Sequence, residues 1–282
     1  MRIFVTGASG WIGSAVVPEL VSAGHQVLGL ARSDASANAV GNMGAEVLRG
    51  DLESDGVIHL AFVVPSVTEA ATRADAKAIE TFATSLAGSG KPLVIAGATL
   101  VTPGRPATER DELVAMGPVA ARITNMRAAL AAADRGVRPC LVMMPRSVHG
   151  HGERHGFVPQ LIARARAMGV SGYIGDGSSR WPAVHVKDAA RLHRLAVERA
   201  PAGAVLNAVG DEGVPVREIA EAIGRHTNLP ARSLPAEELE GMPVRLLSTD
   251  MPASSAITQE LMGWTPTHPG LIEDIEQGHY FI

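Results

Sequence analysis

Cysteine and aromatic residues are scarce in this chain. Among 282 residues Cys140 is the single cysteine, which excludes an intramolecular disulfide and a zinc site built from cysteine thiolates. It lies in the apolar run 139–144, so we expect a buried thiol on a strand and not a nucleophile. Aromatic residues make up only 4 %, and the tyrosines are limited to Tyr173 and Tyr280. Any tyrosine-dependent chemistry must therefore use one of these two positions.

A strong excess of charge and a long hydrophobic run are also missing. The formal net charge is −4 and no basic cluster occurs, so the sequence does not predict binding to nucleic acid. No run reaches the roughly 18 apolar residues of a membrane span, and the chain enters an apolar strand at Arg2 without a signal sequence. We expect a cytoplasmic protein whose partner is a small-molecule substrate, not nucleic acid or a membrane.

Apolar residues, at 46 %, are sufficient for a large buried core. Over the first 145 residues short apolar runs alternate with longer amphipathic ones, which is the pattern of βαβ units in a parallel sheet. The expected strands are 2–6, 25–30, 45–49, 56–61, 92–96, 138–144 and 204–208, and the expected helices are 13–23, 69–87, 118–135, 158–168, 188–199 and 216–226. This order predicts an α/β fold with a Rossmann-type, doubly wound parallel sheet over 1–145, to which 180–212 return. A small C-terminal α/β lobe of 146–179 and 213–282 is expected to bind the substrate.

One connection in this scheme is too short. In the usual strand order the third strand must cross to the fourth over three strand spacings, which with the return along a strand is about 21 Å. The link 52–55 reaches only about 17 Å when fully extended. The crossover helix is therefore expected to be missing, and the third strand is expected to be displaced, shortened or absent.

Glycines at a spacing of three follow the first strand and open the first helix, a context typical of dinucleotide binding. Gly7 permits a tight turn, Gly10 lets the backbone approach a pyrophosphate, and Gly13 allows the helix to pack closely on the strand. The amides at the start of the helix, together with its dipole, stabilise phosphate charge. The predicted loop contacts are Gly7, Ser9, Gly10, Trp11, Ile12 and Gly13.

The end of the second strand indicates which dinucleotide is bound. An acidic residue there would bind the ribose 2′-hydroxyl of NAD, but Arg32 and Ser33 occupy this place. A guanidinium and a hydroxyl suit a 2′-phosphate, so NADP is the expected cofactor. Asp34 follows too late for the ribose and is expected to cap the next helix. The alternative for Arg32 is a solvated surface arginine.

The glycine spacing, together with the stretches 49–52, 57–61, 144–150 and 181–188, resembles the extended short-chain dehydrogenases/reductases, in their atypical NAD(P)-dependent epimerase/dehydratase branch. The resemblance covers nearly the whole chain. It implies that Asp51 and Leu52 line the adenine and that Leu60 and Ala61 lie by the central ribose. It also implies that Pro145, Ser147 and Val148 lie by the nicotinamide, and that helices 69–87 and 118–135 pair in a homodimer.

The catalytic pair of that family is missing. The family uses Tyr-x-x-x-Lys on the helix after the fifth strand, where the lysine cation lowers the pKa of the tyrosine so that it can pass a proton. Counting back from the end of this helix places the pair at Val119 and Ile123, and the helix contains no tyrosine and no lysine. The usual mechanism cannot run from its usual place.

Five residues remain as candidates for the catalytic site. Thr99 after the fifth strand is suited to bond a substrate carbonyl, as is Thr102, although each also suits a turn. Arg122 could bind an anionic substrate or remain solvated on its helix. His149 is a candidate acid or base, and Tyr173 could reach the cleft from the lobe or pack within it. The histidines around His149 have loop spacings that do not predict a metal site.

Two functions remain open. The first is an NADP-dependent oxidoreductase or epimerase-like enzyme that acts on a small carbonyl or alcohol with a non-standard proton donor. The second is an NADP(H)-binding protein without redox activity, either a sensor or a cyclase or isomerase that uses the dinucleotide structurally. The intact glycine loop and lobe favour the first, and the missing pair favours the second.

Overall fold

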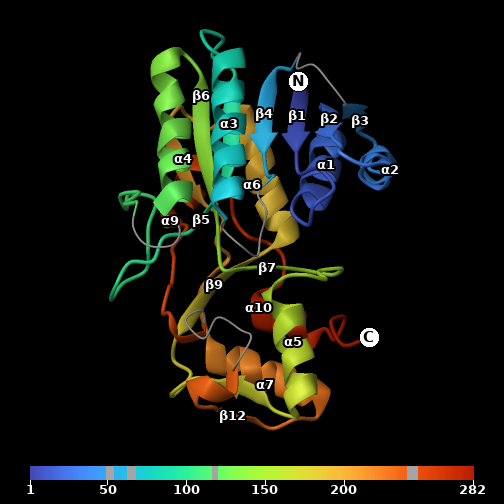
Figure 1. Ribbon diagram of the computed structural model, residues 1–282, viewed down its shortest axis with the longest axis vertical. Coiled ribbons are helices and arrows are strands. Elements are labelled where there is room, and N and C mark those ends of the chain that lie inside the picture. The colour runs from blue at the N-terminus through green and yellow to red at the C-terminus, as the bar shows by residue number, and fades with distance from the viewer. Residues whose placement is uncertain (49–53, 62–67, 116–119, 240–246) are drawn as a thin grey trace.

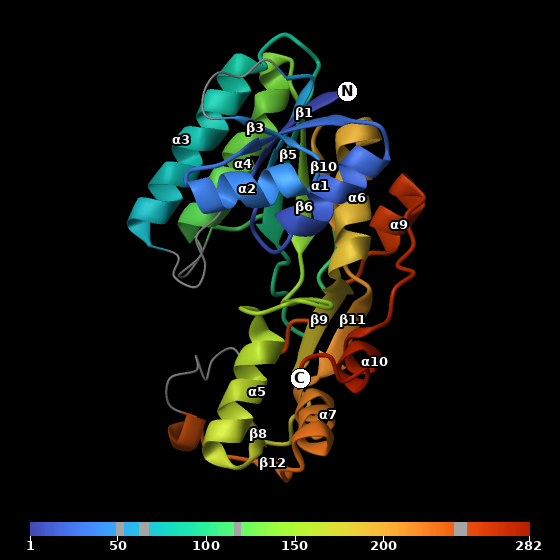
Figure 2. The same cartoon turned by 90° about the vertical axis from the view of Figure 1, so that its right-hand side faces the viewer.

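The structure is a computed structural model that describes residues 1–48, 54–61, 68–115, 120–239 and 247–282. A larger sheet domain lies above a smaller lobe in Figures 1 and 2, and the chain passes between the two more than once. Among the described residues, no helix is both long enough and apolar enough to cross a membrane.

The sheet domain is built on parallel strands in the order β10-β6-β5-β4-β1-β2-β3. The strands are β1 Arg2–Thr6, β2 Gln26–Leu30, β3 Glu46–Leu48, β4 Gly56–His59, β5 Pro92–Ala98, β6 Arg138–Met144 and β10 Ala204–Asn207. The order confirms the predicted Rossmann-type doubly wound sheet. Because the strands are parallel, all of their carboxyl ends lie along one edge, which faces the lobe (Figure 1).

Helices cover both faces of this sheet, as Figures 1 and 2 show. The helices are α1 Gly13–Ser22, α2 Asp34–Asn42, α3 Glu69–Ser85, α4 Ala120–Ala131 with the 3-10 turn Ala132–Arg135, and α6 Val186–Arg199. Successive side chains of a strand point to opposite faces. Ile3 and Val5 of β1 accordingly pack with α1 and α6, whereas Phe4 packs with α3 and α4. Cys140 on β6 is buried, which confirms the predicted strand thiol, and burial raises its pKa to about 12.

The third strand departs in part from the expectation. β3 pairs in parallel with β2 at the ordinary edge position, with Leu28 opposite Glu46 and Leu30 opposite Leu48, so the expectation that it is displaced or absent is wrong. Its described part, Glu46–Leu48, is short, in agreement with the expected shortening. Residues 49–53 of the link to β4 lie outside the described residues, so the expected absence of a crossover helix stays a prediction.

The lobe has its own small sheets and helices. Its strands are β7 Ser147–His149, β8 Ser171–Tyr173, β9 Arg180–His185, β11 Asp211–Pro215 and β12 Ala231–Ser233, and its helices are α5 Phe157–Met168, α7 Val216–Thr227 and α10 Leu271–Glu276, with a 3-10 turn at Ala236–Leu239. β11, β9 and β7 form one sheet, and β12 and β8 form another. Their core gathers around Trp181, which confirms the predicted α/β lobe. α9 Ala256–Met262 then packs against β10 and α6, back on the sheet domain.

Candidate functional site

The glycine loop lies at the carboxyl end of β1, and its glycines are required by close backbone contacts. Gly7 has φ +70°, and a Cβ there would lie 2.9 Å from the amide nitrogen of Ala61. A Cβ on Gly13 would lie 2.2 Å from the carbonyl oxygen of Gly7. Any side chain at these positions would push the loop away from β4 and α1. The close approach therefore depends on glycine, as the spacing predicts.

Two hydrogen bonds join the loop to other strand ends. The indole N–H of Trp11 donates to the carbonyl oxygen of Val148 at 2.8 Å, beside β7. The amide of Ala61 donates to Oγ1 of Thr6 at 3.3 Å. The structure thus brings three groups of predicted cofactor contacts to one edge of the sheet. They are the glycine loop (Gly7, Ser9, Gly10, Trp11, Ile12 and Gly13), the end of β4 (Leu60 and Ala61) and the segment after β6 (Pro145, Ser147 and Val148). Asp51 and Leu52 lie outside the described residues.

This edge fits a dinucleotide. At the start of α1, which begins at Gly13, the amides of Trp11, Ile12 and Gly13 have no backbone acceptor among the described residues, whereas that of Ser14 donates to Gly10. With no side chains on Gly7, Gly10 and Gly13, a pyrophosphate can approach these amides and the positive end of the helix dipole. The loop would hold the phosphates of such a cofactor by backbone donors.

The end of β2 differs from the prediction in one detail. Ser33, not Asp34, is the N-cap of α2, and its hydroxyl accepts a hydrogen bond from the amide of Ser36 at 3.2 Å. Asp34 is the first residue of the helix, where its charge complements the dipole. Arg32 is exposed and makes no hydrogen bond or ion pair with any residue that the structure describes. Its guanidinium is therefore available to a ligand.

A buried polar network lies beneath this edge, between the sheet, α3 and α4. The carboxylate of Asp75 pairs with Nε2 of His59 at 3.1 Å, with the guanidinium of Arg122, and with the amide of Asn125 at 2.6 Å. Burial alone would raise the pKa of Asp75, but these hydrogen bonds and the charge of Arg122 outweigh it and hold the pKa below its usual range. His59 in turn hydrogen-bonds with Thr6 at 2.6 Å.

The network shows where Arg122 lies. Its side chain is only 11 % exposed and also donates to the carbonyl oxygen of Ala96, so it is not a solvated arginine on a helix face. Asp75 was missed at the level of sequence, although a signal was present. Asp75 lies on the same face of α3 as Thr72, Ile79 and the other buried residues of that helix. A carboxylate on a buried face needs a partner. Ile123, where the family lysine is expected, is buried beside this network; Val119 lies outside the described residues.

Thr99 follows β5 at the carboxyl edge, and its hydroxyl is buried with no hydrogen-bond partner in the described structure. Its amide donates to the carbonyl oxygen of Met144 at 2.9 Å, which joins the ends of β5 and β6. Ser147 has a second buried hydroxyl without a partner. Thr102 is different because its hydroxyl donates to Asp111 at 3.3 Å. Of the two predicted threonines, Thr99 is the one with a free hydroxyl.

His149 belongs to a cluster with the C-terminal segment. It is fully buried, and its Nδ1 lies 2.9 Å from Asp274, which also bonds His279 at 3.0 Å. Burial alone would raise the pKa of Asp274, but the two histidines outweigh it and hold that pKa low. The hydroxyl of Tyr280 donates to Glu153 at 2.7 Å, and burial raises the pKa of Glu153 to about 7. The described residues contain no group of three or more side chains able to hold a metal ion.

Tyr173 lies apart from these residues. It is on β8, which pairs with β12 at the end of the lobe remote from the sheet domain (Figure 1). Its ring packs in the lobe core and lies 6.0 Å from the guanidinium carbon of Arg217. The structure does not bring Tyr173 to the edge that carries the glycine loop.

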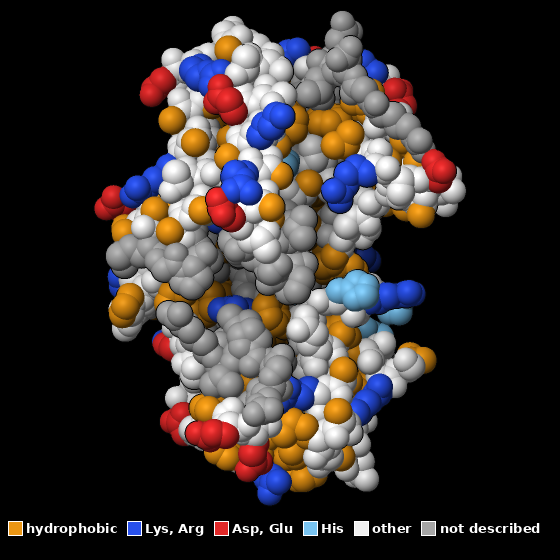
Figure 3. All heavy atoms as spheres, viewed as in Figure 1, with side chains coloured by type: hydrophobic (Ala, Val, Ile, Leu, Met, Phe, Trp, Pro, Cys, Tyr) orange, Lys and Arg blue, Asp and Glu red, His pale blue; other side chains and the backbone are white. Residues whose placement is uncertain are grey.

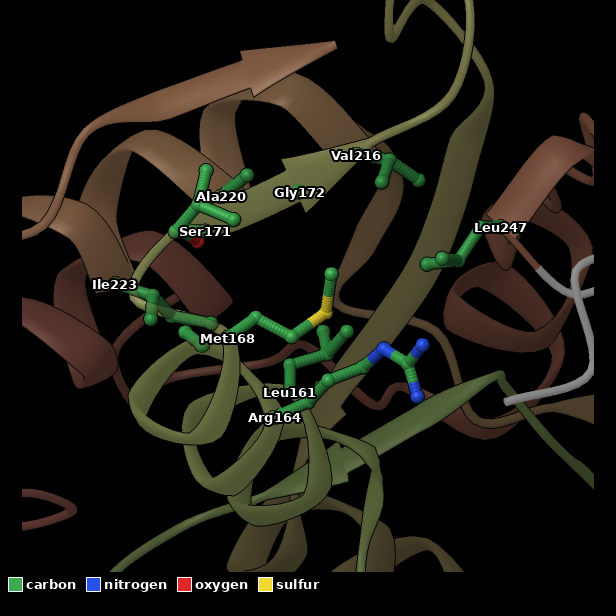
Figure 4. Close-up of a pocket in the computed structure, with 11 residues that line it drawn as sticks. Leu161, Arg164, Met168, Ser171, Gly172, Val216, Ala220, Ile223 and Leu247 are labelled. Atoms are coloured by element: carbon green, nitrogen blue, oxygen red, sulfur yellow. The ribbon is translucent and has the colours of Figure 1, made fainter. Parts of the chain in front are cut away.

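A cavity inside the lobe is too small for a substrate. Side chains of α5 and α7, among them Leu161, Met168 and Ile223, line it together with Leu247 (Figure 4). Its volume is about 10 Å³, which is the room of a single water. The glycine loop and the unpartnered hydroxyls of Thr99 and Ser147 instead place the candidate site at the carboxyl edge of the sheet.

Comparisons with known proteins agree with this geometry. Residues 3–208 match the model of the NAD dependent epimerase/dehydratase family. An uncharacterized protein of Schizosaccharomyces pombe is 41 % identical over the whole of both chains. A 2-alkyl-3-oxoalkanoate reductase of Stenotrophomonas maltophilia is 31 % identical over 78 % of this chain and 73 % of its own. A UDP-glucose 4-epimerase of Thermotoga maritima, solved with UDP-glucose, is 18 % identical with a TM-score of 0.77, over 100 % of this chain and 98 % of that one.

Proposed function

Since this chain belongs to the NAD dependent epimerase/dehydratase family, we propose that it is an NADP-dependent oxidoreductase that interconverts a small ketone or aldehyde and its alcohol. The cofactor would lie on the sheet domain of residues 1–145, and the substrate between that domain and the lobe. One relative carries the name of a reductase of an oxo acid, which supports the reaction type.

The unpartnered hydroxyl of Thr99 is the observation that carries this proposal. A buried hydroxyl without a hydrogen bond costs about 1–3 kcal/mol, and Thr99 bears this cost at the carboxyl edge of the sheet. A substrate oxygen placed there would satisfy it. Thr99 directly follows β5, so its hydroxyl is placed to bond the carbonyl oxygen of a substrate at this edge.

In the proposed reaction, cofactor, protein side chain and water have separate roles. A bound NADP(H) would supply the hydride. The hydroxyl of Thr99 donates to the substrate carbonyl oxygen and stabilises the negative charge that develops on it. Because the helix that carries Ile123 has no tyrosine or lysine, the proton comes from water in the cleft. The Asp75 network supports this site from below by tying α3 and α4 to β4.

Thr99→Val tests the mechanism, with Thr102→Val as the matched control. A panel of ketones and aldehydes is assayed by NADPH consumption, and NADPH binding is measured by fluorescence. We expect Thr99→Val to lower kcat/KM at least tenfold with unchanged NADPH affinity, and Thr102→Val to stay within threefold of the wild type. Equal activity of the two variants would refute the role of Thr99.

Arg32→Ala tests the choice of cofactor. The exposed guanidinium of Arg32 is suited to a 2′-phosphate, so its loss should weaken NADPH binding at least tenfold and leave NADH binding unchanged. Arg73→Ala, at an exposed arginine of α3, is the control. An unchanged preference between NADPH and NADH in Arg32→Ala would remove the basis for NADP.

The missing tyrosine and lysine favour a second candidate, a protein that binds NADP(H) without redox chemistry. It would be a sensor, or a cyclase or isomerase in which the dinucleotide is structural. Tight NADPH binding with no consumption across the whole panel would establish this candidate over the first.

A further inference from the structure

Arg146 follows β6 directly and has unusual surroundings for a cation. Its guanidinium carbon lies 5.5 Å from the ring centre of Phe157 and 5.7 Å from that of Trp181. Nε and Nη2 point at the sulfur of Met251, at 3.1 and 2.6 Å. Side chains from α5, β9 and the segment before α9 thus hold the guanidinium plane in a fixed orientation.

No oxygen accepts from this guanidinium in the part of the chain that the structure describes. Three other arginines of low exposure have oxygen acceptors: Arg122 has a carboxylate, Arg138 has carbonyl oxygens at the end of α6, and Arg194 has two glutamates. A thioether is only a weak acceptor, and burial lowers the pKa of Arg146 to about 10. A partly buried charge without a counter-ion carries a desolvation cost that nothing in the described structure repays. An arginine in these surroundings is suited to bind an anionic ligand.

Arg146 lies between the sheet domain and the lobe, where the chain passes from β6 to β7. The bond from the amide of Thr99 to Met144 places the free hydroxyl and Arg146 at the ends of neighbouring strands. The segment that carries the thioether is joined to the loop after β5, because the amide of Ala107 donates to Pro252 at 2.8 Å. Figure 3 shows hydrophobic side chains, in orange, between the sheet domain and the lobe.

We propose that Arg146 binds a carboxylate of the substrate, so that the substrate is a small oxo acid or the corresponding hydroxy acid. This inference rests on the oxidoreductase function proposed above. A planar guanidinium edge matches the two oxygens of a carboxylate, and one positive charge balances a monoanion. A phosphate dianion would leave a buried negative charge uncompensated by Arg146 alone. The carboxylate is held at one strand end while Thr99 bonds the reacting oxygen at the next.

Binding to the protein saturated with NADPH tests the proposal without turnover, because a hydroxy acid and NADPH are both reduced and cannot react. The ligands are 2- and 3-hydroxy acids of three to six carbons, each compared with its methyl ester, and inorganic phosphate, all by titration calorimetry. We expect at least one acid to bind tenfold or more tightly than its ester. Arg146→Met should abolish that difference and leave ester binding unchanged, and Arg146→Lys should retain part of it. Arg138→Met, which removes a structural arginine, should keep the full difference.

Thermal unfolding separates a ligand-binding role from a structural one. Arg146→Met places an apolar chain of similar length between the same rings, so its Tm without ligand should equal or exceed that of the wild type. Arg138→Met should lower the Tm, since it deprives carbonyl oxygens of α6 of their donor.

Three results would overturn the proposal: no acid preference in any pair, an acid preference that survives in Arg146→Met, or tighter binding of phosphate than of every acid. A Tm of Arg146→Met that falls as far as that of Arg138→Met would also overturn it. Acid binding that depends on Arg146 in a protein that oxidises none of the acids would uphold this inference and refute the oxidoreductase function.

Discussion

Replacing Glu153 by glutamine should stabilise the protein by an amount that grows as the pH rises from 4.5 to 7. The Glu153 side chain is buried, its Oε2 accepts from the hydroxyl of Tyr280, and no described cation lies within ion-pair distance. Burial raises its pKa from 4.5 to about 7, and the nearby charge of Asp274 acts in the same direction. The folded state therefore favours the protonated, neutral carboxyl, which glutamine resembles in shape and in lack of charge.

The sign and size of the effect follow from this pKa. Between pH 4.5 and 7 the folded state binds more protons at Glu153 than the unfolded state, so stability falls as pH rises through this window. At about 1.4 kcal/mol for each pH unit, the loss from Glu153 is about 3 kcal/mol by pH 8. The Glu153→Gln variant does not ionise. Its advantage in the free energy of unfolding should thus be near zero at pH 4.5 and grow to about 3 kcal/mol at pH 8.

Urea unfolding at pH 4.5, 6, 7 and 8 measures this difference for the wild type and Glu153→Gln. Other titrating groups are common to both proteins and cancel in the comparison. Glu218→Gln, at an exposed position on α7, is the control and should show no trend with pH. A difference between Glu153→Gln and wild type that is the same at every pH, or that shrinks as pH rises, would refute the reasoning.

Two further substitutions test the edge of the sheet and the network beneath it. Gly13→Ala would put a methyl group 2.2 Å from the carbonyl oxygen of Gly7, so we expect a loss of about 3 kcal/mol in urea unfolding and weaker NADPH binding by fluorescence; unchanged stability would contradict the close packing. Asp75→Asn leaves the buried charge of Arg122 without a carboxylate and should cost about 3–5 kcal/mol. Glu80→Gln on the same helix removes an exposed ion pair and should cost about 1 kcal/mol or less, so equal losses in the two variants would contradict the importance of the network.

The strand order was predictable because it depends on local patterns. Strands buried on both faces are continuous apolar runs, and the alternation of Ile3, Phe4 and Val5 between two helix layers needs no knowledge of distant residues. The arithmetic of the third crossover predicted a third strand that is displaced, shortened or absent. It could not tell shortening from displacement, because that choice depends on where β3 stops, and a single residue of strand length changes the reach of the link by about 3 Å.

The candidate site was predictable where backbone conformation alone determines the residue, as at Gly7 and Gly13. It was not predictable where partners are remote in sequence. His149 meets Asp274 across 125 positions, and the rings around Arg146 come from two other elements. The homodimer and the cytoplasmic location stay predictions.

Two features of α4 are connected. This helix lacks the family's tyrosine and lysine, and it contributes to the Asp75 network. The polar residues of α4 that could have served a cleft, Arg122 and Asn125, are directed to Asp75 of α3. The polar side chains of α4 therefore stabilise its packing against α3. Displacing Arg122 toward a substrate would leave a buried carboxylate without its cation. Under the proposed function, chemistry must come from the strand ends instead. Thr99, with an unpartnered hydroxyl, and Arg146, with a thioether but no oxygen acceptor in the described structure, lie there at the ends of neighbouring strands.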